Sequence, residues 1–247
     1  MKLETKAFYI QKDGNKEEEY EDAFYYDLSA GVVSIADGAS QAYASKLWAN
    51  ILVKAFVQKI PSLEEGIAKQ SFQEWIKPLA EEWKNEIPWN DLPWNEEMKA
   101  ERGSFSTFLG VKFIRDESRP DIAIWYALAV GDCCLFQIRK NKLIEAFPVR
   151  KSSDFGIDPD LICTRHEYNR VESLQVKTGK CEVGDLVILA TDAFAQWFLS
   201  SYEAREKPWR KLQTMTQEEF KNLIKNLRRS NKIRNDDVTL VCVRFRR

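Results

Sequence analysis

The apolar residues of this chain follow two periods, one typical of helices and one typical of strands. Helical spacing predicts a helix from a Ser40 N-cap to Pro61, a second from Ser62 through Trp83, and others over 193–202 and 217–229. Short apolar runs predict strands over 23–26, 31–36, 107–114, 122–130, 135–139, 142–147, 174–177, 186–190 and 238–245. Residues 149–169 predict a long surface loop, and 178–180 predict a turn.

Strands and helices cluster along the chain and do not alternate strictly. This order favours an α+β layered fold over a doubly wound parallel sheet. The length suits one domain that spans residues 1–247.

Five aspartates stand where predicted strands begin or end. Asp37, Asp132 and Asp192 each follow an apolar strand, and Asp22 and Asp236 each precede one. A single acidic residue at such a junction is most often a turn residue or a cap. Several carboxylates that meet at one edge of a sheet repel one another unless a divalent cation neutralises them. Two interpretations therefore stay open, a metal site and a set of unrelated turn residues.

Composition narrows the chemistry. The 37 Lys and Arg nearly balance the 38 Asp and Glu, so bulk charge gives no support for a nucleic acid or an anionic membrane as partner. No apolar run is long enough to cross a bilayer, and residues 1–6 lack the apolar stretch of a signal peptide. The five cysteines are odd in number and include no CxxC pair, which predicts buried, reduced thiols in a cytoplasmic protein.

His166 is the only histidine, and its polar surroundings predict a surface position. A zinc site with several histidines is therefore excluded. Chemistry in this chain has to rely mainly on carboxylates, which together with water suit Mg²⁺ or Mn²⁺.

An ordered set of short motifs runs from about Tyr20 to about Arg244. It comprises Glu21-Asp22-Ala23, Val33-Ser34-Ile35-Ala36-Asp37-Gly38, Gly103-Ser104-Phe105-Ser106-Thr107, Ala129-Val130-Gly131-Asp132, Gly184-Asp185 with Leu189-Ala190-Thr191-Asp192, and Asn235-Asp236-Asp237-Val238-Thr239. In this order and spacing the set resembles the motifs of the type 2C, metal-dependent (PPM) serine/threonine protein phosphatases, in a divergent, bacterial-like form.

The resemblance implies two stacked antiparallel sheets flanked by helices, with a site for two Mn²⁺ or Mg²⁺ ions. It implies that Asp37 bridges the ions, that the Gly38 carbonyl binds one of them, and that Asp192 and Asp236 hold the other. Asp22, with Glu21 near it, completes the ligands or their water network, and Asp132 helps to hold a third ion. Asp37, Asp192 and Asp236 are thus the expected catalytic residues. A phosphorylated protein is the expected substrate, and water is the expected nucleophile.

Three departures from the family pattern concern contacts with the phosphate and the leaving group. Glu17 stands where many members have a phosphate-binding arginine, although the adjacent Lys16 could supply a point charge. Ala39 stands where eukaryotic members often have a histidine, and Ala193 replaces a later glycine. An active phosphatase and a phosphatase-like binding or regulatory module both remain possible. The former is favoured because an inactive site has no need for clustered carboxylates.

Overall fold

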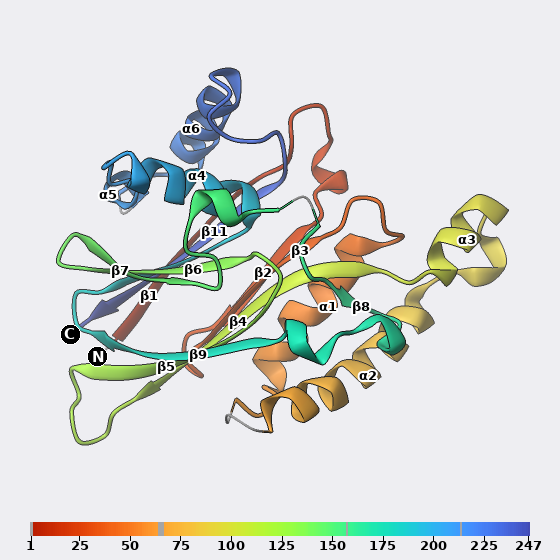
Figure 1. Ribbon diagram of the computed structural model, residues 1–247, viewed down its shortest axis with the longest axis horizontal. Helices are drawn as coiled ribbons and strands as arrows, with labels where there is room; N and C mark the ends of the chain where they lie inside the picture. Colours follow the sequence, from red (N-terminus) through yellow and green to blue (C-terminus); the bar gives the residue numbers. More distant parts are fainter. Residues whose placement is uncertain (1, 64–66, 157, 213) are drawn as a thin grey trace.

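In the computed structural model of the chain, described over residues 2–63, 67–156, 158–212 and 214–247, two antiparallel sheets stack face to face (Figure 1). The first sheet has the strand order β1-β11-β10-β6-β7. The second has the order β2-β3-β4-β5-β9, and β8 pairs with β4. This confirms the α+β class and the sandwich of two antiparallel sheets.

The strands of the first sheet are β1 (Lys2–Ile10), β6 (Cys134–Arg139), β7 (Lys142–Phe147), β10 (Leu186–Ala190) and β11 (Val238–Arg246). Those of the second are β2 (Asp22–Asp27), β3 (Val32–Gly38), β4 (Phe105–Arg115), β5 (Ile122–Val130), β8 (Ile162–Cys163) and β9 (Gln175–Glu182). The helices are α1 (Ser45–Gln58), α2 (Ala68–Glu86), α3 (Trp94–Glu101), α4 (Asp192–Glu203), α5 (Trp209–Leu212) and α6 (Gln217–Arg229). Short 3-10 turns occur at η1 (Glu17–Glu19), η2 (Trp89–Asp91), η3 (Ser152–Asp154), η4 (His166–Tyr168) and η5 (Val171–Ser173).

Three apolar layers hold the sandwich together, because successive side chains of a strand point to opposite faces. In β3, Val33 and Ile35 lie between the sheets, whereas Val32 and Ala36 pack under α1 and α2. In β10, Leu189 lies between the sheets, and its neighbours face α4 and α6. Helices thus cover the outer face of each sheet (Figure 1), and the ends of the strands are left to carry polar residues.

Most predicted elements are present, and the differences have local causes. Ser40 does not cap α1, which begins at Ser45, because residues 39–44 form turns before the helix. The start predicted for the second helix at Ser62 is wrong, because Ser62, Leu63 and Ile67 lie outside α2, which begins at Ala68; residues 64–66 of the predicted span lie outside the described part of the chain. The predicted surface loop contains β8, whose two buried residues pair with β4.

The turn predicted at 178–180 is wrong, because β9 continues through Gly179 and pairs with β5 along its whole length. A Cβ on Gly179 would lie 2.3 Å from the Trp125 indole. Gly179 therefore marks a close approach within a strand, not a turn.

Predictions about single residue types are confirmed. The His166 side chain is 75% exposed. All five cysteines are buried and free.

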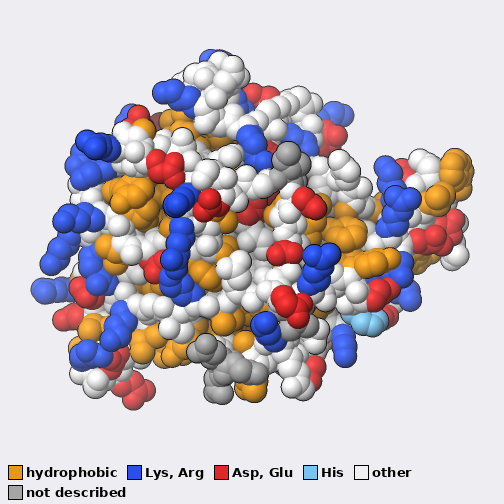
Figure 2. Space-filling view, in the orientation of Figure 1, with side chains coloured by type: hydrophobic (Ala, Val, Ile, Leu, Met, Phe, Trp, Pro, Cys, Tyr) orange, Lys and Arg blue, Asp and Glu red, His pale blue; other side chains and the backbone are white. Residues whose placement is uncertain are grey.

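Within the described residues, no helix has the length and apolarity to cross a membrane. Acidic and basic side chains are interspersed on the face drawn in Figure 2, and apolar side chains gather at the tip of the projecting α3.

Candidate functional site

Asp22 and Asp37 face each other at the ends of two paired strands. Asp22 is the first residue of β2, and Asp37 is next to last in β3, and the antiparallel register makes them direct partners. Like charges placed opposite each other on a sheet are destabilising. Burial is the main cause that raises the pKa of Asp37 well above its usual range, and the charge of Asp22 adds to it. This pair needs a proton or a cation between its carboxylates.

Strand and helix ends bring three more aspartates to the same place. Asp132 follows β5, Asp192 opens α4 directly after β10, and Asp236 lies two residues before β11. The negative charges of all three raise the pKa of Asp37. Burial, and then the charge of Asp192, raises the pKa of Asp132 to about 7. The five aspartates predicted as site residues therefore form one electrostatic cluster, which we call the aspartate cluster: Asp22, Asp37, Asp132, Asp192 and Asp236.

Two glycines allow the backbone to adopt the shape that this cluster needs. Gly131, just before Asp132, has a φ of +88°, and a Cβ there would lie 2.6 Å from the Asp160 carbonyl oxygen. Gly38, just after Asp37, lies so close to α1 that a Cβ would meet the Ser45 carbonyl at 2.8 Å.

Two threonine hydroxyls connect the sheets through Asp22. The Thr191 hydroxyl donates to Asp22 Oδ2 at 3.0 Å, and the Thr239 hydroxyl donates to the same oxygen at 2.7 Å. Asp22 belongs to the second sheet, while Thr239 lies on β11 of the first and Thr191 follows β10. The cluster therefore requires both sheets to be in place.

Three carboxylate oxygens of the cluster are buried without a hydrogen-bond partner among the described residues: Asp22 Oδ1, Asp132 Oδ1 and Asp192 Oδ1. An unpaired buried oxygen on a charged group is costly, so native structures normally give it a partner. Carboxylate oxygens are the donors that Mg²⁺ and Mn²⁺ prefer. The donor set therefore fits a divalent cation.

One guanidinium is bound to the cluster. Arg234 pairs with Asp192 Oδ2. Burial alone would lower the pKa of Arg234, but the negative charges of Asp192, Asp236 and Asp132 outweigh this effect and raise it. In the described ranges, no group of three or more His, Cys, Asp or Glu side chains is arranged to hold a metal ion. Arg234 holds Oδ2 of Asp192 and two threonine hydroxyls hold Oδ2 of Asp22, while Oδ1 of each carboxylate has no hydrogen-bond partner among the described residues.

Asp237 has a different environment from Asp236. Its side chain is buried, and its oxygens accept the backbone N–H groups of Lys12 at 2.8 Å and Glu21 at 2.7 Å. Both oxygens therefore hold the segment that leads into β2. Asp236 stays the residue of this pair that is expected to be a ligand.

Cations beside the cluster are not those expected from the sequence. Lys16 and Glu17 are exposed, and the backbone N–H of Lys16 donates to the Glu19 carboxylate within the turn η1. Lys12 instead pairs with Glu21. Burial would lower the pKa of Lys12, but the charges of Glu21, Asp237 and Asp236 outweigh this effect and raise it.

Sequence reasoning assigned no role to Thr191, Thr239, Lys12 or Arg234. Thr191 lies next to Asp192, and Thr239 lies three residues after Asp236, each within a motif that resembles the phosphatase family. This spacing could have indicated that both threonines lie at the site. Lys12 and Arg234 lie outside the motifs. Their positions depend on how the loops fold, and no local pattern in the sequence indicates them.

Comparisons with known proteins agree with this fold. The sequence profile described as protein phosphatase 2C matches residues 15–229. No curated protein matches the chain significantly. Among solved structures, the catalytic domain of the serine/threonine phosphatase PstP in complex with two manganese ions superimposes with a TM-score of 0.63 at 14% identity, covering 98% of each chain.

Two further structures are similar. The Mycobacterium tuberculosis phosphatase PstP/Ppp gives a TM-score of 0.62 at 14% identity over 100% of both chains. PppA, a regulatory component of T6SS in Pseudomonas aeruginosa, gives 0.57 at 16% identity over 99% of this chain and 98% of that one. These identities support the fold alone, whereas the profile covers most of the sequence. The chain belongs to the protein phosphatase 2C family.

Proposed function

We propose that this protein is a metal-dependent phosphatase that hydrolyses phosphoserine and phosphothreonine esters of cytoplasmic proteins. The observation that carries the proposal is that Asp22, Asp132 and Asp192 each have a buried carboxylate oxygen without a hydrogen-bond partner among the described residues, and that Asp22 directly opposes Asp37. Burying carboxylates that repel one another lowers the stability of the folded state, and divalent cations bound by these carboxylates would offset this effect.

Asp37, Asp192, Asp236, Asp22, Asp132 and the Gly38 carbonyl are the groups that would hold two or three Mn²⁺ or Mg²⁺ ions. Such ions, when bound, supply the Lewis acidity that makes water a nucleophile at neutral pH.

The chain's own residues position and neutralise the reacting groups. The Thr191 and Thr239 hydroxyls hold Asp22 in one orientation. Lys12 and Arg234 are the cations beside the cluster that can bind phosphate oxygens, and Arg234 offers the two-pronged donor geometry that suits phosphate.

A cysteine nucleophile has no support in this site. Burial raises the pKa of both Cys133 and Cys134, so neither supplies a thiolate at neutral pH. Water is therefore the nucleophile that this arrangement favours.

The alternative is a phosphatase-like binding or regulatory module. It is favoured by the Arg234–Asp192 ion pair, in which an internal cation already neutralises one proposed ligand. Ala39 and Glu17, at positions where relatives often carry groups for the leaving group and the phosphate, also support it.

Hydrolysis of an aryl phosphate and of a phosphothreonine peptide, with and without Mn²⁺ or Mg²⁺, decides between these two functions. We expect turnover with metal and none after chelation. Hydrolysis that survives thorough chelation contradicts the mechanism. Metal binding without turnover of either substrate supports the binding module.

A further inference from the structure

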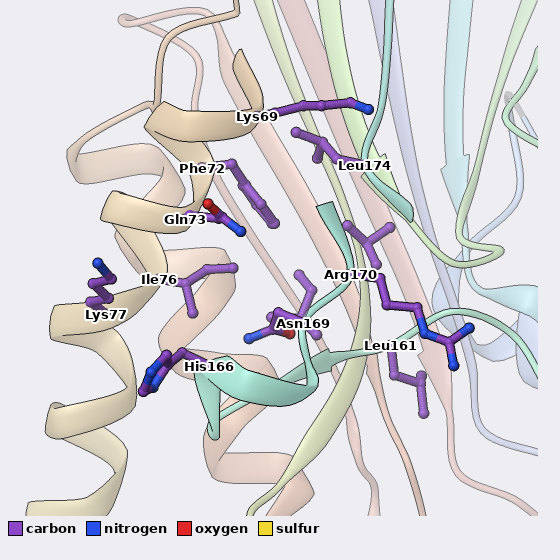
Figure 3. Close-up of a pocket in the computed structure, with 12 residues that line it drawn as sticks. Lys69, Phe72, Gln73, Ile76, Lys77, Leu161, His166, Asn169, Arg170 and Leu174 are labelled. Carbon is purple, nitrogen blue, oxygen red and sulfur yellow. The ribbon is translucent and has the colours of Figure 1, made fainter. Parts of the chain in front are cut away.

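A cavity separate from the aspartate cluster lies between α2 and residues 161–174. Its volume is about 170 Å³. Figure 3 shows Phe72 and Ile76 pointing from α2 toward the opposite wall, where Leu161 and Leu174 lie. A cavity of about 150 Å³ holds a benzene molecule, so this one has room for a single aliphatic or aromatic side chain.

The rim of this cavity is basic. Lys69, Lys77 and Arg170 line it, and no Asp or Glu is among the described residues of its lining. All three cations are exposed, and within the described part of the chain none of them has an ion pair or a hydrogen bond from its side chain. In Figure 3, Lys69 extends from α2 over Leu174. A ligand with acidic groups around one apolar group would match this lining in both charge and shape.

Helix stability does not explain Lys69. It is the second residue of α2, at the positive end of the helix dipole, where a cation is mildly unfavourable. The helix dipole therefore does not stabilise the charge of Lys69, whereas an anionic ligand would neutralise it.

A second hollow of about 600 Å³ lies further along α2, and His166 lines both hollows. Its lining includes Glu81, Glu101 and Glu167, so it does not extend the basic rim. On α2 the basic cavity alone runs from Lys69 to Lys77, about 12 Å at the usual helical rise, and an extended segment of about four residues covers this length.

The cavity also adjoins the aspartate cluster. Val130, which lines the cavity, is two residues before Asp132. The backbone at Asp160, beside the cavity residue Leu161, packs on Gly131. A segment bound in the cavity would therefore lie next to a phosphorylated residue held at the cluster.

We propose that this cavity is a docking site for an acidic segment of the phosphoprotein substrate, and that one apolar side chain of the segment enters it. The identification of the partner as a substrate rests on the proposed phosphatase function. The docking itself does not, because it depends only on the lining of the cavity.

Binding of a fluorescein-labelled peptide of about four residues, a phenylalanine flanked by glutamates, tests the proposal by fluorescence anisotropy on the full chain. We expect saturable binding to the wild type. Lys69→Glu combined with Lys77→Glu should weaken it by about tenfold or more, because two attractive charges become repulsive. The matched control, Lys54→Glu with Lys225→Glu, makes the same charge change on two other exposed helical positions and should leave binding nearly unchanged.

A second peptide, with serine in place of phenylalanine, tests the apolar part without any change to the protein. It should lose most of the affinity. Absence of saturable binding to the wild type, equal weakening in both double variants, or equal binding of the serine peptide would each overturn the proposal. Aryl phosphate hydrolysis by the wild type gives a separate result, so docking without turnover would refute the phosphatase function and leave the docking site standing.

Discussion

At the scale of single residues, the neighbours Asp236 and Asp237 have different tasks. Asp236 adds negative charge to the aspartate cluster, whereas both oxygens of Asp237 accept backbone N–H groups. An amide at 237 could accept only one of these bonds and would turn its NH₂ toward the other N–H.

We therefore expect Asp237→Asn to lower the free energy of unfolding by about 1–3 kcal/mol while the folded protein keeps its metal-dependent hydrolysis. Asp236→Asn should do the reverse, losing hydrolysis without losing metal-free stability. Differential scanning fluorimetry and aryl phosphate turnover below the melting temperature measure both. If Asp237→Asn abolished turnover with its metal-free stability unchanged, Asp237 would be the ligand.

Arg234 neutralises Asp192 in the absence of a metal ion, so it should compete with metal binding. A half-exposed ion pair is worth about 1 kcal/mol, which corresponds to roughly a fivefold change in a dissociation constant. Arg234→Gln should tighten Mn²⁺ binding by about this factor in isothermal titration calorimetry. Arg229→Gln, on the exposed surface of α6, serves as the charge-matched control. Weaker Mn²⁺ binding by the Arg234 variant would show that the arginine supports the metal ion and does not compete with it.

At the scale of elements, β9 makes one close contact with β5 in addition to its backbone pairing. Gly179 lies against the Trp125 indole, and Trp125 Nε1, on the ring edge nearest to this glycine, donates to Gln137 Oε1 at 2.9 Å, so the ring is held in place. A side chain at 179 has no room unless this ring moves.

Gly179→Ala should therefore destabilise the protein by about 1–3 kcal/mol in chemical denaturation, because overpacking displaces Trp125. Gly156→Ala is the control, since a Cβ at Gly156 would have its nearest contact at 3.8 Å. Mn²⁺ affinity of the folded fraction should be the same for both variants. Equal stability of both variants would mean that the indole is free to move.

Periodicity was sufficient to predict long elements and insufficient where tertiary contacts decide. β5 and α6 match their predicted spans because each has a continuous apolar face. Gly179 was predicted to lie in a turn, but it lies within β9, where the Trp125 indole of β5 leaves no room for a side chain. The short β8 exists only because β4 lies beside it. The aspartates were recognisable because strand ends carry them, but the threonines and cations around them reach the site through long-range folding.

At the scale of the whole molecule, the like charges of the aspartate cluster oppose folding. On the proposed function Mn²⁺ binds the folded state and not the unfolded chain, so at a concentration of 100 times its dissociation constant it should raise the free energy of unfolding by about 2.7 kcal/mol. A melting curve in increasing Mn²⁺ measures this effect.

Asp37→Asn removes one of two opposed carboxylates. It should raise the metal-free melting temperature, eliminate the shift caused by Mn²⁺, and reduce turnover by several orders of magnitude. Asp121→Asn, at an exposed position outside the cluster, should behave like the wild type. A variant at Asp37 that still gained stability from Mn²⁺ would contradict the assignment of Asp37 as the bridging residue.

The pairing of β1 with β11 makes the first and last strands neighbours, and Thr239, which holds Asp22, lies on that last strand. During translation at about 5–20 residues per second, Asp22 leaves the ribosome on the order of ten seconds or more before Thr239. During this interval Asp22 lacks the Thr239 hydroxyl, one of the two that orient its carboxylate in the folded protein. The rate of chain elongation therefore sets the earliest time at which the aspartate cluster can assemble, because β11 has to leave the exit tunnel first.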